Sequence, residues 1–299
     1  MDAKPAIGFI GAGFMGHGMA KNIVEKGFPL TVLGHRNRVP VDDLVKRGAK
    51  EAKTAAELAA KSDIVFLCVT GSAQVEALVR GPVGLKAGAR TDMIIADCST
   101  ADPTSTLALA AELAPMGVHF IDAPLGGTPA QAEAGKLWAM VGAAPEVFER
   151  IKPVCEAWAG KVDRVGKVGD GHKMKLINNF LSMGYGAIYA EALTLAQKTG
   201  ITPKVFDSVL RGSRMDCGFY QTYMTYVLER DPEAHKFTIA NAAKDMRYLS
   251  ALADAEGVAN PVGSAVKNAY AAALAAGRGT DFVPMLSDFV AAGAGVKLG

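Results

Sequence analysis

Short apolar runs alternate with amphipathic stretches through the first half of the chain. Apolar runs at 6–10 and 30–33 flank a stretch whose apolar positions recur at helical spacing. The alternation continues with strands predicted near Ala49 and at 64–69, 93–98, 119–121 and 137–141, and with helices predicted at 41–47, 54–60, 73–79, 103–113 and 145–157. Strands that alternate with helices predict a doubly wound α/β domain, in which a parallel sheet has both faces covered.

The second half of the chain has a helical pattern from His172 almost to its end. The pattern breaks at 200–203, 212–218, 231–233, 257–261 and 277–280. We therefore expect an α/β domain over residues 1–166 and an all-α domain over residues 167–299, and the length of 299 residues suits two domains. A long helix that begins after Gly169-Asp170-Gly171 is expected to link them, with the active site in the cleft between the domains.

This linking helix carries polar and small side chains along one face. At 3.6 residues per turn, one stripe holds Lys175, Asn179, Ser182, Gly186 and Tyr189 beside an apolar stripe. An ammonium group among apolar neighbours is costly unless its charge has a use, so Lys175 is a candidate proton donor. The alternative is that the Lys175 stem packs on the helix while its ammonium reaches solvent. Ser182 and Gly186 leave space for another group to approach.

A glycine-rich turn joins the first predicted strand to the first predicted helix. Gly11, Gly13 and Gly16 have the G-x-G-x-x-G spacing. The first glycine of this motif permits a tight turn, the second lets a pyrophosphate approach backbone N–H groups, and the third lets the helix pack on the strand. With a strand on each side of the turn and helix, the motif predicts a Rossmann dinucleotide-binding domain.

Basic residues, rather than a carboxylate, follow the second predicted strand. The chain reads Gly34-His35-Arg36-Asn37-Arg38, with no acidic residue before Asp42. A site that prefers NAD usually has an acidic residue here for the ribose diol, whereas arginine suits a 2′-phosphate. Arg36 and Arg38 therefore favour NADP(H) over NAD(H). The alternative is that both are solvated loop residues.

Polar residues and glycines follow several of the other strands. Thr70, Ser99 and Thr100 stand at strand ends, where a parallel sheet binds its ligands, so we expect them to line the cofactor cleft. Their alternative role is to cap the next helices. Gly126 and Gly127 expose backbone N–H groups, as an anion-binding loop needs, although a hairpin turn would also use two glycines.

The amino-acid composition excludes several classes of protein. Half of the residues are hydrophobic and 21% are charged, which is ordinary for a globular protein of this size, and the net charge of +2 indicates no particular partner. No tract is rich in lysine and arginine, and no apolar stretch approaches about eighteen residues, so we expect no nucleic-acid partner, no membrane and a cytoplasmic location. The cysteines are scattered without metal-ligand spacing, which predicts reduced thiols and no metal. Alanine-rich segments at 269–276 and 291–294 predict a homodimer or homotetramer.

Four segments in fixed order resemble the β-hydroxyacid dehydrogenases. They are Gly8–Gly16, Asp97–Thr100, Asp122–Gly127, and Gly169–Gly171 with Lys175 and Asn179. The pair Lys244-Asp245, preceded by Phe237, also matches the pattern of this family on the cofactor side. The family includes 3-hydroxyisobutyrate dehydrogenase, tartronate semialdehyde reductase, glyoxylate/succinic semialdehyde reductase and γ-hydroxybutyrate dehydrogenase. The resemblance covers essentially the whole chain, and its motifs do not separate these members.

The resemblance implies a set of site residues. Lys175 would be the catalytic acid/base, and Asn179 would hold the substrate oxygens. The substrate would also contact Ser99, Thr100, Gly126, Gly127, Thr128 and Asn178. The cofactor would contact Gly11, Gly13, Phe14, Met15, Gly16, His35, Arg36, Arg38, Val69, Thr70, Thr100 and Lys244.

Two positions depart from the family pattern. Gly126 stands where a serine is usual, so backbone N–H groups or Thr128 must replace a hydroxyl toward the substrate carboxylate. A Gly-Arg-Thr version of this loop occurs in sulfolactaldehyde reductases, and the present loop lacks its arginine. His172 stands where glutamine is common, and we expect from it no role beyond contact with the bound ligand.

These features predict an oxidoreductase that moves a hydride reversibly between a nicotinamide and a small carboxylated aldehyde or β-hydroxyacid. Candidate aldehydes are tartronate, succinic and methylmalonate semialdehyde and glyoxylate. The alternatives on the same fold are a sulfolactaldehyde reductase and an imine reductase, although an imine reductase usually has another residue at the lysine position. A non-catalytic cofactor-binding module is disfavoured because Lys175 and Asn179 are both present.

Overall fold

The chain forms two compact units. The structure, a computed structural model, describes residues 4–299 and divides the chain into unit 1 (Met1–Lys175) and unit 2 (Leu176–Gly299). The boundary predicted from the sequence, between residues 166 and 167, precedes this division. The division falls inside a helix rather than in a loop, so the first turn of that helix belongs to unit 1.

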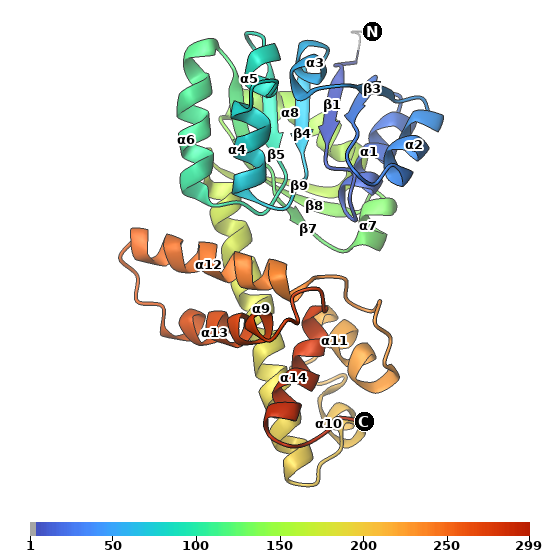
Figure 1. Cartoon of the computed structure of the whole chain (residues 1–299), viewed down its shortest axis with the longest axis vertical. Helices are drawn as coiled ribbons and strands as arrows, with labels where there is room; N and C mark the ends of the chain where they lie inside the picture. Colours follow the sequence, from blue (N-terminus) through green and yellow to red (C-terminus); the bar gives the residue numbers. More distant parts are fainter. Residues whose placement is uncertain (1–3) are drawn as a thin grey trace. The chain divides into compact units, whose positions relative to one another are not determined.

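Unit 1 is a twisted sheet covered by helices (Figure 1). Its strands are β1 (Ile7–Ile10), β2 (Leu30–Leu33), β3 (Lys50–Ala52), β4 (Ile64–Leu67), β5 (Ile94–Asp97), β6 (His119–Asp122), β7 (Leu125–Gly126), β8 (Leu137–Gly142) and β9 (Ala159–Gly166). Its helices are α1 (Gly16–Glu25), α2 (Val39–Lys46), α3 (Ala55–Ala60), α4 (Ser72–Arg80), α5 (Leu85–Gly88), α6 (Pro103–Leu113), α7 (Pro129–Glu133) and α8 (Pro145–Trp158), with a 3-10 turn at Ala114–Met116.

The strand order is that of a Rossmann sheet, as predicted. The order β3-β2-β1-β4-β5-β6 is parallel throughout, and the sheet then continues through β8 and β7 in antiparallel pairing. Crossing from β3 to β4 reverses the direction in which strands are added, and this reversal beside β1 is where such sheets bind dinucleotides.

Alternate residues of the central strands build two separate cores. Ile7 and Phe9 of β1 pack with α1, α2 and α8 on one face, whereas Ile10 packs with α3 to α6 on the other. Phe66 and Leu67 divide in the same way along β4. Because side chains of a strand point to opposite faces in turn, continuous apolar runs are buried on both sides, as the sequence predicts.

Four elements of unit 1 are absent from the prediction. The short pieces α5, β7 and α7 have too few residues for a periodic pattern. Strand β9 follows α8, so the helix predicted to close the domain does not close it. Most side chains of β9 are at least partly exposed, and its polar residues hide the alternation of a buried strand.

Unit 2 is helical, as expected. Its elements are α9 (Asp170–Lys198), which begins in unit 1, α10 (Pro203–Leu210), α11 (Gly218–Glu229), α12 (Ile239–Ala255), α13 (Pro261–Ala275) and α14 (Leu286–Gly293), with a 3-10 turn at Val283–Met285. The described residues add one isolated bridge, between Thr238 and Phe282. Within residues 4–299, no helix combines the length and the apolar character that crossing a membrane would take.

Close helix packing explains a glycine in the polar stripe of α9. The hydroxyl of Tyr270 donates to the carbonyl of Met183 at 3.1 Å, and a Cβ at Gly186 would lie 2.6 Å from that hydroxyl. Tyr223 in turn donates to the carbonyl of Gly186 at 3.2 Å. The space at Gly186 is therefore taken by a tyrosine of the core.

Candidate active site

The glycine turn after β1 leaves room for a dinucleotide. Gly11 has φ +103°, and a Cβ on Gly11 or Gly16 would overlap backbone atoms of Cys68 or Gly11. A Cβ on Gly13, in contrast, would meet nothing among the described residues within 4 Å. Gly11 and Gly16 thus close the turn, whereas Gly13 borders open space. This is the arrangement that a pyrophosphate needs.

The N-terminus of α1 adds donors to this space. Met15 precedes the helix without a side-chain cap, and its first turn contains no acidic residue. The start of a helix can bind an anion through its first N–H groups, and the helix dipole favours negative charge there. In α1, the N–H of His17 already donates to the carbonyl of Gly13 at 3.0 Å. The residues present fit a bound dinucleotide at this turn.

The two arginines after β2 differ in their surroundings. Arg38 donates to both carboxylate oxygens of Glu51, at 2.5 and 2.9 Å, and to Asp42 at 2.9 Å. These bonds raise the pKa of Arg38 above its ordinary value. Arg36 is exposed, and no hydrogen bond or ion pair involves it in the described part of the chain. Arg36 is therefore the more accessible cation beside the glycine turn.

Hydrogen bonds tie the loops after β4 and β5 together. The hydroxyl oxygen of Ser99 accepts from the N–H of Val69 at 3.0 Å, and the N–H of Ser99 donates to Asp97 at 2.9 Å. Ser99 is buried, whereas Thr70 is exposed and Thr100 is half-buried. These residues lie at strand ends on the same edge of the sheet.

The alternative role of these residues as helix caps is wrong. The residue that precedes α4 is Gly71, which has no capping side chain. The N-cap of α6 is Asp102, whose carboxylate accepts from the N–H of Thr104. Thr70, Ser99 and Thr100 therefore precede the capping positions.

The loop after β6 contains a short strand and a capped helix. Gly126 lies in β7, and Gly127 has φ +128°, a backbone conformation that side chains rarely adopt. The hydroxyl of Thr128 accepts from the N–H of Gln131, and the Gln131 side chain accepts from the N–H of Thr128. The N–H and the hydroxyl oxygen of Thr128 therefore form this capping box with Gln131.

Buried Asp122 anchors the start of α9. Its two carboxylate oxygens accept from the N–H groups of Gly169 and His172, each at 2.7 Å. Burial raises the pKa of the Asp122 carboxyl, and His172 and the N–H groups oppose that rise. A Cβ at Gly171 would lie 2.5 Å from the carbonyl of Met140, so only glycine lets this turn lie so close to β8.

His172 lies in the interior of unit 1. Its side chain is fully buried, and Nδ1 is 2.7 Å from the hydroxyl of Thr106. Nε2 is 3.1 Å from the carbonyl of Ser99 and 3.8 Å from Oδ2 of Asp97. His172 thus joins α9 to α6 and to the loop after β5, a structural role that the sequence analysis did not assign to it.

Lys175 and Asn179 lie one turn apart on α9. Lys175 is half-buried, and Asn179 is buried. The amide of Asn179 donates to Oδ2 of Asp245 at 2.7 Å, and Asn178 donates to Oδ1 of Asn179 at 3.4 Å. Asn179 is therefore held in one orientation by a buried carboxylate.

Asp245 contacts the candidate site residue Asn179, and the sequence analysis quoted it without giving it a role. It is fully buried, and its Oδ1 lies 3.2 Å from Nζ of Lys244. The ammonium of Lys244 also lies 5.5 Å from the ring centre of Tyr248. A buried carboxylate inside an apolar helix pattern is the signal that could have identified Asp245, because such groups are rarely buried without a partner.

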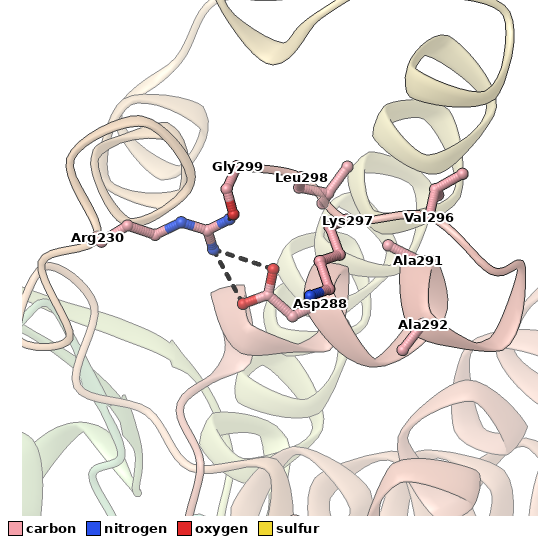
Figure 2. Close-up of a pocket in the computed structure, with 8 residues that line it drawn as sticks. All are labelled: Arg230, Asp288, Ala291, Ala292, Val296, Lys297, Leu298 and Gly299. Atoms are coloured by element: carbon pink, nitrogen blue, oxygen red, sulfur yellow. Dashed lines mark hydrogen bonds and ion pairs between the residues drawn. The ribbon is translucent and has the colours of Figure 1, made fainter.

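A separate pocket in unit 2 contains none of these residues. Its volume is about 250 Å³, and Arg230 donates to Asp288 at 2.9 and 3.0 Å. Figure 2 shows the residues that line it and this pair. The guanidinium charge is thereby neutralised within the protein. Among the described residues, no group of three or more histidine, cysteine, aspartate or glutamate side chains is arranged to hold a metal ion.

Comparison with known protein families gives two matches that together cover nearly the whole chain. Residues 6–166 match the NAD binding domain of 6-phosphogluconate dehydrogenase. Residues 169–287 match the NAD-binding domain of NADP-dependent 3-hydroxyisobutyrate dehydrogenase. With the Rossmann sheet and its glycine turn, these matches define an NAD(P)-dependent oxidoreductase. The chain belongs to the β-hydroxyacid dehydrogenase family, and its resemblance to that family is confirmed.

Relatives and solved structures agree with this assignment. The chain is 35% identical over 210 residues to 2-(hydroxymethyl)glutarate dehydrogenase of Eubacterium barkeri, which covers 70% of this chain and 69% of the relative. It is 32% identical over 274 residues to 3-sulfolactaldehyde reductase of Escherichia coli, which covers 92% of each. The crystal structure of 3-hydroxyisobutyrate dehydrogenase from Salmonella typhimurium superimposes with a TM-score of 0.86 at 25% identity, over 96% of this chain and 100% of the other.

Proposed function

We propose that this enzyme interconverts small carboxylated aldehydes and their β-hydroxyacids with NADP(H). The observation that carries the proposal is the pair on α9: Lys175 stands one turn before Asn179, whose amide is oriented by Asp245. An ammonium and an oriented amide on one helix face are the groups that a carbonyl oxygen needs when it becomes a hydroxyl.

Lys175 acts as the acid/base in this proposal. During reduction its ammonium gives a proton to the oxygen of the aldehyde while the carbon accepts a hydride, and during oxidation Lys175 takes the proton back. When bound, the nicotinamide supplies or accepts the hydride. A positioned acid of this kind contributes about 10² to 10⁴ in rate. Asn179, with Asn178 beside it, holds the substrate oxygens in the orientation that this transfer requires.

The loop at Gly126 and Gly127 would hold the acid group of the substrate. In this proposal, backbone N–H groups of the loop or the hydroxyl of Thr128 carry the contact, because the hydroxyl oxygen accepts from Gln131 in the capping box and can still donate its own hydrogen. Ser99 and Thr100, after β5, would border the same group. His172 supports Ser99 from inside unit 1 through the Ser99 carbonyl.

Arg36 supports a preference for NADP(H). The exposed guanidinium follows β2, where the ribose of the adenosine half lies in dinucleotide-binding folds. Arg38 would act from farther away because Glu51 and Asp42 already pair with it. Phe14, Met15, His35, Val69, Thr70 and Lys244 complete the proposed cofactor contacts.

We also propose that the enzyme works in the cytoplasm as a homodimer or homotetramer. The support is the alanines at 269–276 and 291–294, which would let helices of two subunits approach closely. Light scattering of the purified protein measures the assembly directly, and a monomeric mass would contradict this part of the proposal.

Sulfolactaldehyde is a second candidate substrate. It is favoured by the relative from Escherichia coli, which matches over 92% of both chains. Gly127 stands where a sulfonate would want an arginine, so we rank carboxylated aldehydes first. An imine reductase is ranked lower because Lys175 is present.

Initial rates with NADPH and NADH test the proposal. The purified enzyme is assayed against tartronate, succinic and methylmalonate semialdehyde, glyoxylate, sulfolactaldehyde and a cyclic imine. We expect turnover of a carboxylated aldehyde with NADPH, and we expect Lys175→Ala to lower kcat about 10² to 10⁴-fold while NADPH binding persists. Unchanged kcat in that variant, or turnover of the imine alone, would overturn it.

A further inference from the structure

Gly126 and Trp138 are directly opposite each other in the sheet. The antiparallel register of β7 and β8 pairs these two residues, and paired residues present their side chains on the same face. A Cβ at Gly126 would lie 3.3 Å from Cε3 and 3.5 Å from Cβ of Trp138. A side chain at position 126 would therefore press against the indole, which would have to move by a few tenths of an ångström.

Neighbours on β9 hold the indole in place. Its N–H donates to Asp163 at 2.8 Å, and Nζ of Lys161 lies 4.5 Å from the ring centre. Lys161 also pairs with Asp163 at 2.7 Å. Since the single N–H of the indole is used by Asp163, the ring presents carbon atoms toward Gly126.

The same face of the sheet carries the start of α9. Met140 follows Trp138 on this face, with its methyl carbon 3.9 Å from a Cβ at Gly126. A Cβ at Gly171, in the first turn of α9, would lie 2.5 Å from the carbonyl of Met140 and 2.7 Å from Asp122. The turn that leads to Lys175 thus packs on the face that bears the indole.

We propose that Trp138 is a specificity-determining residue that acts together with Gly126. This inference rests on the proposed function, in which the Gly126 loop holds the acid group of the substrate. A serine at position 126 would offer a hydroxyl for a hydrogen bond beside that acid group. With Gly126, the edge of the Trp138 ring lies there instead. The site therefore prefers β-hydroxyacids and aldehydes with an alkyl group next to the carboxylate over those with a hydroxyl there, because a buried hydroxyl without a partner is costly.

Two stable hydroxyacids test this preference. 3-Hydroxyisobutyrate and glycerate differ by a methyl group in place of a hydroxyl next to the carboxylate, and both are oxidised with NADP⁺. An apolar pocket discriminates such isosteres by about 10- to 100-fold, so we expect a kcat/KM ratio of that size in favour of the methyl compound.

Variants of the pair locate the origin of the ratio. Trp138→Thr should reduce it about tenfold, whereas Trp138→Phe, which keeps the ring and loses only the N–H, should retain most of it. Gly126→Ser alone should lower kcat/KM for both compounds and lower Tm slightly, because the new side chain presses against the ring. When Trp138→Thr is already present, Gly126→Ser should be tolerated and should shift the kcat/KM ratio further toward glycerate.

The outcomes separate this inference from the proposed function. If hydroxyacids are turned over but no variant changes the kcat/KM ratio, and if the two substitutions have additive effects on Tm and kcat/KM, the role of Trp138 is overturned. The proposed function would not be affected by that result. Absence of turnover of every hydroxyacid and aldehyde would overturn the proposed function and the specificity with it. A wild-type preference for glycerate would overturn the direction of the inference.

Discussion

The side-chain amide of Asn179 donates a 2.7 Å hydrogen bond to Oδ2 of Asp245, and both side chains are buried. Since the carboxylate can only accept, the bond fixes which end of the amide faces Asp245. The amide oxygen is thereby turned toward Asn178, which donates to it at 3.4 Å. A residue of α12 therefore sets the orientation of a side chain on α9.

Asp245→Asn should lower kcat/KM about 10- to 100-fold. The substituted amide is a donor as well as an acceptor, so Asn179 loses its fixed orientation, and misplacement of about 1 Å is enough for such a loss. Steady-state kinetics with the best substrate measures the effect. Asp254→Asn, an exposed change on the same helix, serves as the control, and equal rates in the two variants would contradict this role.

His172→Ala should reduce the free energy of unfolding by about 2 to 4 kcal/mol. The change leaves a cavity and removes the partner of Thr106 and of the Ser99 carbonyl. Urea unfolding measures the difference, with His119→Gln as a matched control at a more exposed histidine. A loss of less than about 1 kcal/mol would show that the buried contacts of His172 matter little to the fold.

Gly13→Ala and Gly16→Ala should affect different properties. Gly13 borders open space, so its new methyl group should leave Tm unchanged and weaken NADPH binding. Gly16 lies against the carbonyl of Gly11, so its methyl group should lower Tm by itself. Thermal unfolding without cofactor and titration of NADPH fluorescence separate the effects, and a large loss of Tm in Gly13→Ala would contradict the prediction.

Arg36→Ala should weaken NADPH binding about 10- to 100-fold and leave NADH binding nearly unchanged, because the lost bonds are charge-assisted and reach only the 2′-phosphate. Arg38→Ala should have a smaller effect on the NADPH/NADH ratio, since Glu51 and Asp42 hold that guanidinium. Dissociation constants of NADPH and NADH, measured for both variants and the wild type, test this prediction. Equal loss for NADH in Arg36→Ala would remove Arg36 from the cofactor preference.

His235 should make unfolding depend on pH between about 6.5 and 4. Burial lowers its pKa to about 4, while the unfolded chain keeps the ordinary value near 6.5. In that window the unfolded state binds the proton first, so stability is present above pH 6.5 and is lost as the pH falls, by up to about 3 kcal/mol. Denaturation of wild type and His235→Gln across the window measures the difference, and parallel curves would contradict it.

The sequence predicts features that follow from a local pattern, but it does not predict features that depend on contacts between distant segments. The apolar runs of β1, β4 and β5 identify themselves because both faces of a central strand are buried. Strand β9 lacks such a pattern because most of its side chains are at least partly exposed. In the site, Lys175 and Asn179 share one helix and could be paired from their spacing alone.

The partners of these residues could not be found in that way. Asp245 meets Asn179 from another helix, and His172 meets Ser99 across the interior of unit 1. Such pairs depend on how distant segments pack, which no local period encodes. Trp138 likewise acquires its place only through the register of β7 and β8.

The two units divide inside helix α9, and this limits where residues can be inserted or deleted in the chain. A linker would absorb an insertion, but one residue added between Lys175 and Asn179 rotates everything beyond it by about 100° about the helix axis. Lys175 and the amide of Asn179 would then occupy different faces although every residue of the candidate site was still present. Exchange of helical domains between relatives must therefore conserve helical phase at this junction, and insertions should accumulate in the loops instead.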